Sequence, residues 1–250
     1  GKRLRPVLLM AAADAVGANG ENFVHLATSI EMIHTYSLIH DDLPAMDNDD
    51  YRRGKLTNHK VFGDGVAVLA GDALLTMAFE VIADSPNVDV AKKLKIVKEI
   101  SHAAGPEGMV GGQVIDLESE GKHIDMNTLQ KMHRAKTGAL FCAAIRSGAI
   151  LGDATDKQLE ALTEYARQFG LAFQITDDIL DVTGDEASIG KPVGSDEKNH
   201  KSTYVTLGSL QSAKDLAQKA VDNAKEALKN FGTEADFLRE IVDYLISRKK

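Results

Sequence analysis

The stretch "SLIHDDLPAMDNDDYRRGK", residues 37–55, places a dense cluster of charge at the end of an apolar run. Five of the ten residues from 41 to 50 are Asp, and two Arg and a Lys follow within five positions. The side chains that lead into the cluster recur every three or four positions, which is the spacing of one helix face: Leu26, Ile30, Ile33, Ser37 and Asp41. The sequence therefore predicts a helix whose buried face ends in a carboxylate.

A second stretch, "AFQITDDILD" at residues 172–181, repeats this arrangement. Its helix face is traced by Leu159, Leu162, Ala166, Phe169, Phe173 and Asp177. Asp181 lies one turn beyond Asp177 on the same side, whereas we expect Asp178 to point away from that face. The two stretches together predict two similar acidic half-sites at the mouth of the core.

Buried carboxylates need a cationic partner, because an unpaired charge in the interior is strongly unfavourable. A ligand set of oxygen atoms alone, without His or Cys, is typical of Mg²⁺, which usually shares its carboxylates with substrate phosphates. Pro44 ends the first helix after Asp42, so the chain can return Asp47 towards Asp41. We therefore predict Mg²⁺ ligands at Asp41, Asp42, Asp47, Asp177 and Asp181.

Basic and polar side chains accompany both acidic clusters. Lys136 is the most informative, because it falls where a core residue is expected on the stripe Leu129, Met132, Lys136 and Leu140. It either extends its ammonium group to solvent or faces the same cavity as a phosphate ligand, beside Thr137. Gln174, one turn before Asp177, is expected to face that cavity too. Arg and Lys around Mg²⁺ form a diphosphate clamp, and the apolar face beneath should then hold an apolar tail.

The composition excludes several classes of protein. The chain has 250 residues, 44% hydrophobic and 26% charged, which is typical of a globular protein with a substantial core. A formal net charge of −8 argues against a general nucleic-acid-binding protein. The single cysteine, Cys142, excludes an intrachain disulfide and fits a cytoplasmic location. We find no uncharged apolar run long enough to span a bilayer, and therefore predict no membrane span.

Helical periodicity covers nearly the whole chain, with no convincing alternating strand. No linker divides residues 1–250, so we predict a single all-α domain, a bundle of about ten helices around a central cavity. The predicted helices cover residues 5–16, 23–42, 64–83, 88–104, 107–119, 128–151, 156–183, 203–208, 210–230 and 234–248. The chain begins "GKRLRP" without Met, so we expect a further helical segment before Gly1.

Several stretches, in a fixed order, carry a resemblance to a known family. They are "GKRLRP", "DDLPAMD", "RRGK", "GGQVIDLE", "HRAKTGAL", "DDILD" and "HKSTY". On these motifs the chain resembles the trans-prenyltransferases, the all-α isoprenyl diphosphate synthases, over essentially its whole length. Within that family it is most similar to the bacterial farnesyl diphosphate synthases. "DDLPAMD" and "DDILD" are similar to the first and second aspartate-rich motifs of the family.

The resemblance implies condensation of isopentenyl diphosphate with an allylic diphosphate, dimethylallyl or geranyl, by a homodimer. It implies three Mg²⁺ ions in the full substrate complex, held by the five Asp residues named above. It implies allylic-diphosphate contacts from Arg52, Lys136, Lys191 and Lys201. It implies isopentenyl-diphosphate contacts from Lys2, Arg5, His34 and Arg53. The residues implied to act on the reacting groups are Arg52, Lys136, Thr137 and Gln174.

Product length can be argued from the first helix. A growing tail should run from Asp41 towards the helix N-terminus, and Tyr36 lies five residues back, about 7.5 Å of helix rise. Its ring is either an ordinary core aromatic or the floor of the tail pocket, with the small Ser37 leaving room above it. The family resemblance favours the floor, and with it a C15 product. Beyond this argument, a C20 product from a geranylgeranyl diphosphate synthase stays open.

Three alternative functions can be compared with this interpretation. A di-iron helical bundle would use Glu-x-x-His pairs, and the chain has them at Glu31/His34, Glu99/His102, Glu120/His123 and Glu197/His200. The last two pairs fall in predicted loops, which argues against four inward helix faces. A terpene cyclase would not need the second basic cluster of Lys2, Arg5 and Arg53. A non-catalytic subunit would be expected to lack one of the two Asp-rich motifs.

Overall fold

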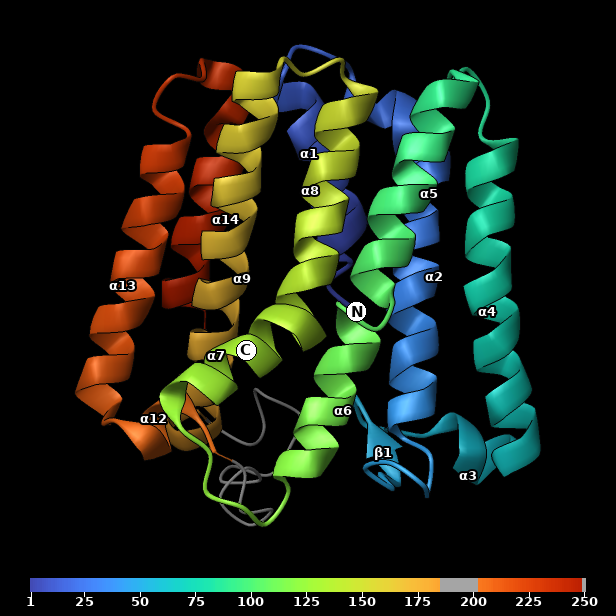
Figure 1. Cartoon of the computed structure of the whole chain (residues 1–250), viewed down its shortest axis with the longest axis vertical. Helices are drawn as coiled ribbons and strands as arrows, with labels where there is room; N and C mark the ends of the chain where they lie inside the picture. Colours follow the sequence, from blue (N-terminus) through green and yellow to red (C-terminus); the bar gives the residue numbers. More distant parts are fainter. Residues whose placement is uncertain (185–201, 249–250) are drawn as a thin grey trace.

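The computed structural model describes residues 1–184 and 202–248 as a bundle in which most of the long helices run roughly parallel or antiparallel to one another (Figure 1). The first half contains α1 (Leu4–Ala15), the 3₁₀ turn η1 (Gly20–Phe23), α2 (Val24–Asp41), α3 (Asn58–Phe62), α4 (Asp64–Asp84), α5 (Val90–Ala104) and α6 (Met109–Ser119). The second half contains α7 (Met126–His133), the π-helical turn η2 (Arg134–Gly138), α8 (Ala139–Leu151), α9 (Asp156–Thr183), α12 (Tyr204–Leu207), α13 (Leu210–Ala227), η3 (Thr233–Ala235) and α14 (Asp236–Ser247). The predicted all-α class is confirmed.

Most predicted helix boundaries agree with the structure to within two or three residues. The longest helix, α9, begins and ends where the sequence predicted, because Thr155 and Gln158 form the reciprocal hydrogen bonds of a capping box. The first acidic helix, predicted over residues 23–42, is the continuous helix α2, and the 3₁₀ turn η1 lies directly before it. The predicted helix 128–151 is also divided, with the π-helical turn η2 between α7 and α8.

One expectation about strands was wrong. A short antiparallel hairpin follows the first acidic cluster and pairs β1 (Tyr51–Arg52) with β2 (Lys55–Leu56). Its two turn residues, Arg53 and Gly54, both have positive φ angles, 53° and 72°. That is the backbone of a tight two-residue hairpin turn. Two-residue strands are too short for an alternating pattern to reveal them, yet this hairpin sets the direction of the Arg52 side chain.

Helix α8 lies at the centre of the bundle and packs against α1, α5 and α9 (Figure 1). Two cores lie on its two sides. One is built on α1, α8, α9, α13 and α14 and includes Phe141, Tyr165 and Phe169; the other is built on α2, α4, α5 and α8 and includes Ile30, Ile33 and Tyr36. The cores hold the C-terminal ends of α2 and α9 in place, and these ends carry the two acidic clusters.

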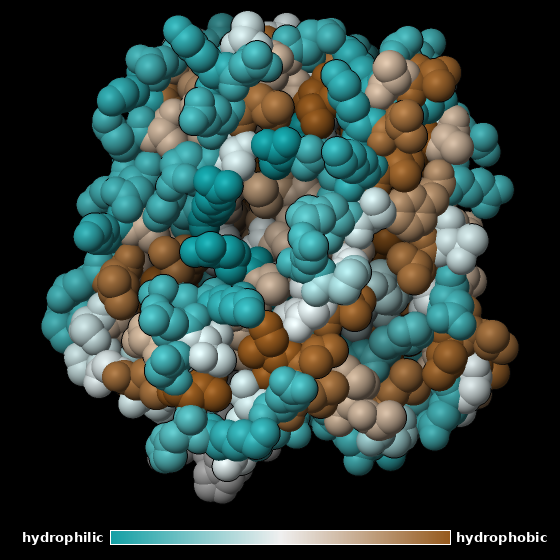
Figure 2. Space-filling model, in the orientation of Figure 1, coloured by the Kyte–Doolittle hydropathy of each residue, from teal (hydrophilic) through white to brown (hydrophobic). Residues whose placement is uncertain are grey.

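Helix α4 has an unusually exposed apolar surface, and Figure 2 shows apolar residues at the surface along the edge of the molecule where this helix lies. Its exposed side chains include Val66, Val68, Leu69 and Met77, and Leu69 is 67% exposed. Within the described residues, α4 is also the one helix whose length and composition would allow it to cross a membrane, with a mean hydropathy of 1.9. Asp72 and Glu80 lie in this helix, so it is not the uncharged apolar run that we expected of a membrane span.

Candidate active site

The first acidic cluster is neutralised by an arginine from the hairpin. Asp42, which is buried, accepts hydrogen bonds from Arg52 Nε at 2.8 and 2.9 Å and from Arg52 Nη2 at 2.6 Å. Burial lowers the pKa of Arg52, but the Asp42 hydrogen bond and charge outweigh it, so the pKa is raised overall. This forked ion pair fixes the hairpin against the end of α2.

Asp41 is the shared partner of three other elements. Gln113 of α6 donates a hydrogen bond to Asp41 Oδ1, Arg52 Nη2 lies 3.8 Å from Asp41 Oδ2, and Lys136 Nζ lies 4.0 Å from Asp41 Oδ1. Lys136 is bound more closely to Asp116 of α6, with Nζ 2.6 Å from Oδ2. The Lys136 side chain is 25% exposed. It therefore belongs to this charged cluster and does not extend freely into solvent.

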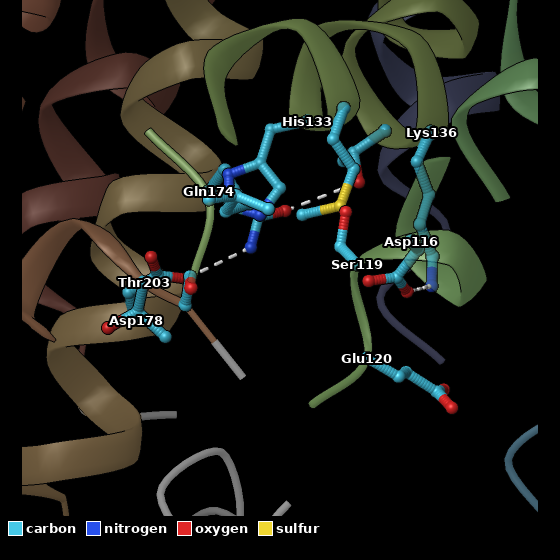
Figure 3. A pocket seen from close by; sticks show the side chains of 12 residues that line it. Asp116, Ser119, Glu120, His133, Lys136, Gln174, Asp178 and Thr203 are labelled. Carbon is cyan, nitrogen blue, oxygen red and sulfur yellow. Dashed lines mark hydrogen bonds and ion pairs between the residues drawn. The ribbon is translucent and has the colours of Figure 1, made fainter. Parts of the chain in front are cut away.

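The π-helical turn brings Lys136 and Thr137 to a cavity of about 140 Å³ between α6, α7 and α9 (Figure 3). Turns of this kind recur at functional sites, because the extra residue redirects side chains. Close contact with α6 depends on Gly112, where a Cβ atom would overlap the backbone of Lys136. Three of the four predicted catalytic residues line this cavity, namely Lys136, Thr137 and Gln174.

A chain of hydrogen bonds crosses the wall of this cavity. Thr137 Oγ1 donates to Gln174 Oε1 at 3.2 Å, and Gln174 Nε2 donates to Asp178 Oδ1 at 3.1 Å (Figure 3). The other oxygen of Asp178 accepts a hydrogen bond from the backbone N–H of Tyr204, at 2.9 Å. Asp178 thereby connects α9 to the start of α12 and orients the Gln174 amide.

The structure corrects the predicted orientation of the second acidic cluster. Asp178, expected to point away, is 3% exposed and lines the cavity, whereas the Asp177 side chain is 43% exposed. The reason is tertiary: α12 and α13 pack on the other side of α9, which gives this helix a second buried face. Asp181, one turn further on, is half-buried.

Asp177 is paired with an arginine from the C-terminal end of the described chain. Arg248 Nη2 binds Asp177 Oδ1 and also donates to the carbonyl oxygen of Phe173 and to Thr176 Oγ1, at 3.1 and 2.8 Å. Its guanidinium carbon lies 4.6 Å from the centre of the Phe173 ring. Arg248, near the C-terminus, thus reaches the second acidic cluster.

A second cationic group surrounds His34. Burial, followed by the charges of Arg5, Arg53 and Arg52, lowers the pKa of His34 to about 3. Two of the residues that act on His34, Arg5 and Arg53, are predicted with it to hold isopentenyl diphosphate. Arg5 is buried, stacks 4.4 Å from the centre of the Phe141 ring, and has a pKa lowered by burial to about 10. Lys2 is exposed nearby in sequence.

The proposed length-determining residues lie on α2, one turn before the acidic cluster. Tyr36 is 6% exposed and packs in the α2–α4 core, and Ser37 is half-buried with Oγ donating 2.8 Å to the carbonyl oxygen of His34. Among the described residues, the wall of the 140 Å³ cavity does not include either side chain. Their predicted role in product length is therefore separate from this cavity.

The donor set can be compared with the needs of Mg²⁺. Within residues 1–184 and 202–248, no three carboxylate or imidazole groups are already gathered in a metal-binding arrangement. Mg²⁺ commonly takes only one or two protein carboxylates and completes its shell with water and phosphate. Asp41, Asp47, Asp177 and Asp181 are all partly exposed at the ends of α2 and α9, which fits this pattern. Asp42 fits less well, because Arg52 occupies both of its oxygens.

The di-iron reading finds no support in the described residues. Glu99 is bound by Arg146, with Nε 2.7 Å and Nη2 2.8 Å from its two oxygens, so it is a structural ion pair. The positive charges of Arg5, Arg53 and Arg52 act on His34, and the same charges oppose a metal cation at this imidazole. The Glu197/His200 pair lies outside the described residues, as do Lys191 and Lys201 of the predicted allylic-diphosphate site.

Three residues of this site were not predicted from the sequence: Gln113, Asp116 and, as an inward group, Asp178. Gln113 and Asp116 are three positions apart on one face of α6, inside the motif "GGQVIDLE". A polar pair at this spacing in the mainly apolar first part of the helix was the available signal. Its partners, Asp41 and Lys136, are distant in sequence, so the signal did not identify them.

Comparison with known proteins supports one family. The polyprenyl synthetase family model matches residues 1–245. The chain belongs to the polyprenyl synthetase family. It is 48% identical to the farnesyl diphosphate synthase of Geobacillus stearothermophilus over 250 residues, covering 99% of this chain and 84% of that protein. It is 46% identical to the geranylgeranyl diphosphate synthase of Cyanophora paradoxa over 250 residues, covering 99% and 83%.

The fold of this polyprenyl synthetase family member is also found in solved structures. An FPP/GFPP synthase from Zymomonas mobilis, solved in apo form, superposes with a TM-score of 0.88 at 43% identity, covering 98% of this chain and 84% of that one. Relatives of nearly equal similarity are thus named for products of different length. Overall similarity identifies the family, whereas the product must be argued from individual residues.

Proposed function

We propose that the chain is a farnesyl diphosphate synthase, which joins isopentenyl diphosphate head-to-tail to dimethylallyl or geranyl diphosphate and releases diphosphate. The observation that carries the proposal is the meeting of Asp41, Lys136 and the Thr137–Gln174–Asp178 chain of hydrogen bonds at one end of the bundle. Family membership and the farnesyl diphosphate synthases among its relatives support the same reaction. The geranylgeranyl alternative is less supported.

The charged residues would hold the two substrates in different ways. Mg²⁺, three ions in the full complex, would be held by Asp41, Asp42, Asp47, Asp177 and Asp181, and would stabilise the diphosphate as it leaves. Arg52 and Lys136, which now neutralise Asp42 and Asp116, would turn to the allylic diphosphate, together with Lys191 and Lys201. Lys2, Arg5, His34 and Arg53 would hold isopentenyl diphosphate.

The polar chain at the cavity wall would assist the reacting carbons. Thr137 Oγ1 and Gln174 Oε1 carry partial negative charge, and the Asp178 hydrogen bond keeps the amide in place. Oxygen dipoles fixed in advance stabilise a cation-like allylic carbon without reorganising. The double bond of isopentenyl diphosphate attacks that carbon, and a proton is then lost. The departing diphosphate is the proposed proton acceptor, and exclusion of water protects the cation from quenching.

Tyr36 is proposed as the floor that ends elongation at C15, with Ser37 leaving room above it. The ring is nearly fully buried in the α2–α4 core, where a tail following α2 would meet it. Exchanging Tyr36 for a small residue should open that path. Tyr36→Phe, which keeps the ring, is the matched control.

The experiment that tests the function is a product assay. The protein is incubated with radiolabelled isopentenyl diphosphate and either allylic starter, with Mg²⁺ or with EDTA, and the dephosphorylated alcohols are resolved by length. We expect a C15 product that needs Mg²⁺, unchanged in Tyr36→Phe and extended to C20 or longer in Tyr36→Ser. A C20 product from the unmodified protein would retain the reaction and reject the floor. No prenyl product would reject the function.

We also propose that the enzyme is a cytoplasmic homodimer and that a second copy covers the exposed face of α4. Asp72 and Glu80 are exposed on this helix, and carboxylates are costly in lipid but tolerated at a protein interface. An apolar area that includes Leu69 and Met77 is the kind of surface that subunits cover. Light scattering should give twice the chain mass, and Leu69→Asp should shift it towards the monomer; a monomeric unmodified protein would contradict the proposal.

A further inference from the structure

The imidazole of His40 fills a gap in α4, next to the C-terminal end of α2. Its Nε2 donates a hydrogen bond to the carbonyl oxygen of Val68, at 3.0 Å. The gap exists because residue 71 is glycine: a Cβ atom on the buried Gly71 would overlap the His40 ring. The histidine of the motif "IHDD" therefore packs against one particular residue, the glycine of "LAGDALL", which lies 31 residues further along the chain.

The other edge of the same imidazole contacts Tyr36. The two ring centroids are 5.7 Å apart and the rings meet edge to face, at 81°. Such pairs favour a defined orientation of both rings. Residues 36 and 40 are one helical turn apart on α2, so this contact adds to the local packing of Tyr36. His40 thus connects the backbone of α4 to the ring that we propose as the pocket floor.

We propose that His40, seated against Gly71, is a positioning residue that fixes the Tyr36 ring and thereby sets the length of the prenyl product. The inference rests on the proposed function and on Tyr36 as the floor. The His40 side chain is 28% exposed, so the ring has solvent on one side and α4 on the other. If the gap in α4 were closed, the imidazole would either press on Tyr36 or leave it. Both movements change the floor.

Two single variants test the two sides of this contact. Gly71→Ala closes the gap in α4. His40→Gln removes the ring, while its amide can still donate to the Val68 carbonyl oxygen. For each we expect the share of products longer than C15 to rise about 2- to 10-fold, the range that corresponds to the strength of an aromatic edge contact. The share is measured within one reaction, so it does not depend on the amount of folded enzyme.

The chain offers a matched control on the same helix. Gly65→Ala makes the same chemical change in α4, but no described atom lies within 4 Å of a Cβ at that position. We expect this variant to keep the unmodified product ratio. The double variant His40→Gln/Gly71→Ala should show no further rise over His40→Gln alone, because the two substitutions act through the same ring. Thermal denaturation of each variant shows whether it is folded.

The outcomes separate the inference from the proposed function when Tyr36→Ser is assayed in parallel. Longer products in Tyr36→Ser, together with an unmodified ratio in His40→Gln and in folded Gly71→Ala, would overturn the inference and leave the function standing. Additive rises in the double variant would overturn it as well, since Gly71 would then act independently of His40. If Gly71→Ala does not fold, the share of products longer than C15 in His40→Gln alone decides whether the inference holds. No prenyl product from the unmodified protein would reject both.

Discussion

The two acidic clusters lie at corresponding ends of α2 and α9, but they are held very differently. In the first, the Asp41 and Asp42 side chains are 15% and 5% exposed and are bound by groups from the hairpin, α6 and η2. In the second, Asp178 is buried and binds a backbone N–H, while the Asp177 side chain is 43% exposed and meets Arg248. Two similar sequence motifs therefore place their Asp side chains in two different sets of contacts.

This difference bears on which carboxylates we propose as ligands. In the second cluster, Asp178 joins α9 to α12 and orients Gln174. We therefore assign the proposed ligand role to Asp177, which Arg248 contacts in this structure. In the first cluster the buried residue, Asp42, is again the one most completely paired, through Arg52. The proposed function therefore depends most on the carboxylates of Asp41 and Asp177.

The largest effect is expected at Asp41. Asp41→Asn removes the charge that faces Lys136 and Arg52, and should lower kcat/KM by about 10²–10³-fold, the usual loss for one preorganised electrostatic contact. Steady-state assays at saturating Mg²⁺ measure this. Asp50→Asn is the matched control, because Asp50 pairs with Lys60 in solvent, 2.8 Å away. An active Asp41→Asn enzyme would show that the first cluster is not the site of ionisation.

The next prediction contrasts the two Asp residues of the second cluster. Asp178→Asn should lower the free energy of unfolding by about 1.5–3 kcal/mol, since it weakens buried hydrogen bonds to a charged group. Asp177→Asn should reduce activity more than Asp178→Asn, and it also lowers stability, because the Arg248 side chain that it leaves without a carboxylate is only 2% exposed. Urea unfolding and kcat/KM together test this contrast. Unchanged stability of Asp178→Asn would contradict its structural role.

A smaller effect is expected at Thr137. Thr137→Val removes the hydrogen bond to Gln174 Oε1, worth about 1 kcal/mol, so kcat should fall by about 5-fold while the folded state loses little. Thr76→Val on α4 is the control, because Thr76, among the described residues, bonds to its own helix backbone, at the Asp72 carbonyl oxygen. Single-turnover rates measure the difference. A change confined to KM would place Thr137 in binding and not at the reacting carbons.

The last prediction concerns stability alone, through its dependence on pH. The folded-state pKa of His34 is about 3 and the ordinary value is 6.5, so the unfolded chain binds the extra proton between these values. Stability contributed by neutral His34 is therefore present above pH 6.5 and is lost as pH falls towards 3, by at most about 1.4 kcal/mol per pH unit. His34→Gln should flatten the unfolding free energy between pH 4.5 and 6.5, measured in urea. An unchanged slope would show that His34 is not buried among cations.

Local sequence patterns predicted the helices well, because their signals are local. The capping box at Thr155 and the apolar faces of α2 and α9 depend on neighbours within a few residues. The inward position of Asp178 depends on α12, and the pairing of Lys136 with Asp116 depends on α6. Those contacts join distant segments, so periodicity alone did not reveal them. The family motifs supplied candidate roles for these residues. They did not show which carboxylate oxygen pairs with which basic side chain.

The most direct test of the account is to locate the metal and the diphosphate. Crystals of the full chain grown with Mn²⁺ and a non-hydrolysable allylic diphosphate analogue would identify metal positions by anomalous scattering. We predict Mn²⁺ at Asp41 on one side and at Asp177 on the other, with the diphosphate between them and Lys136 released from Asp116 to contact it. Mn²⁺ bound elsewhere, or a diphosphate that bypasses both clusters, would contradict the claim that the two form one catalytic site.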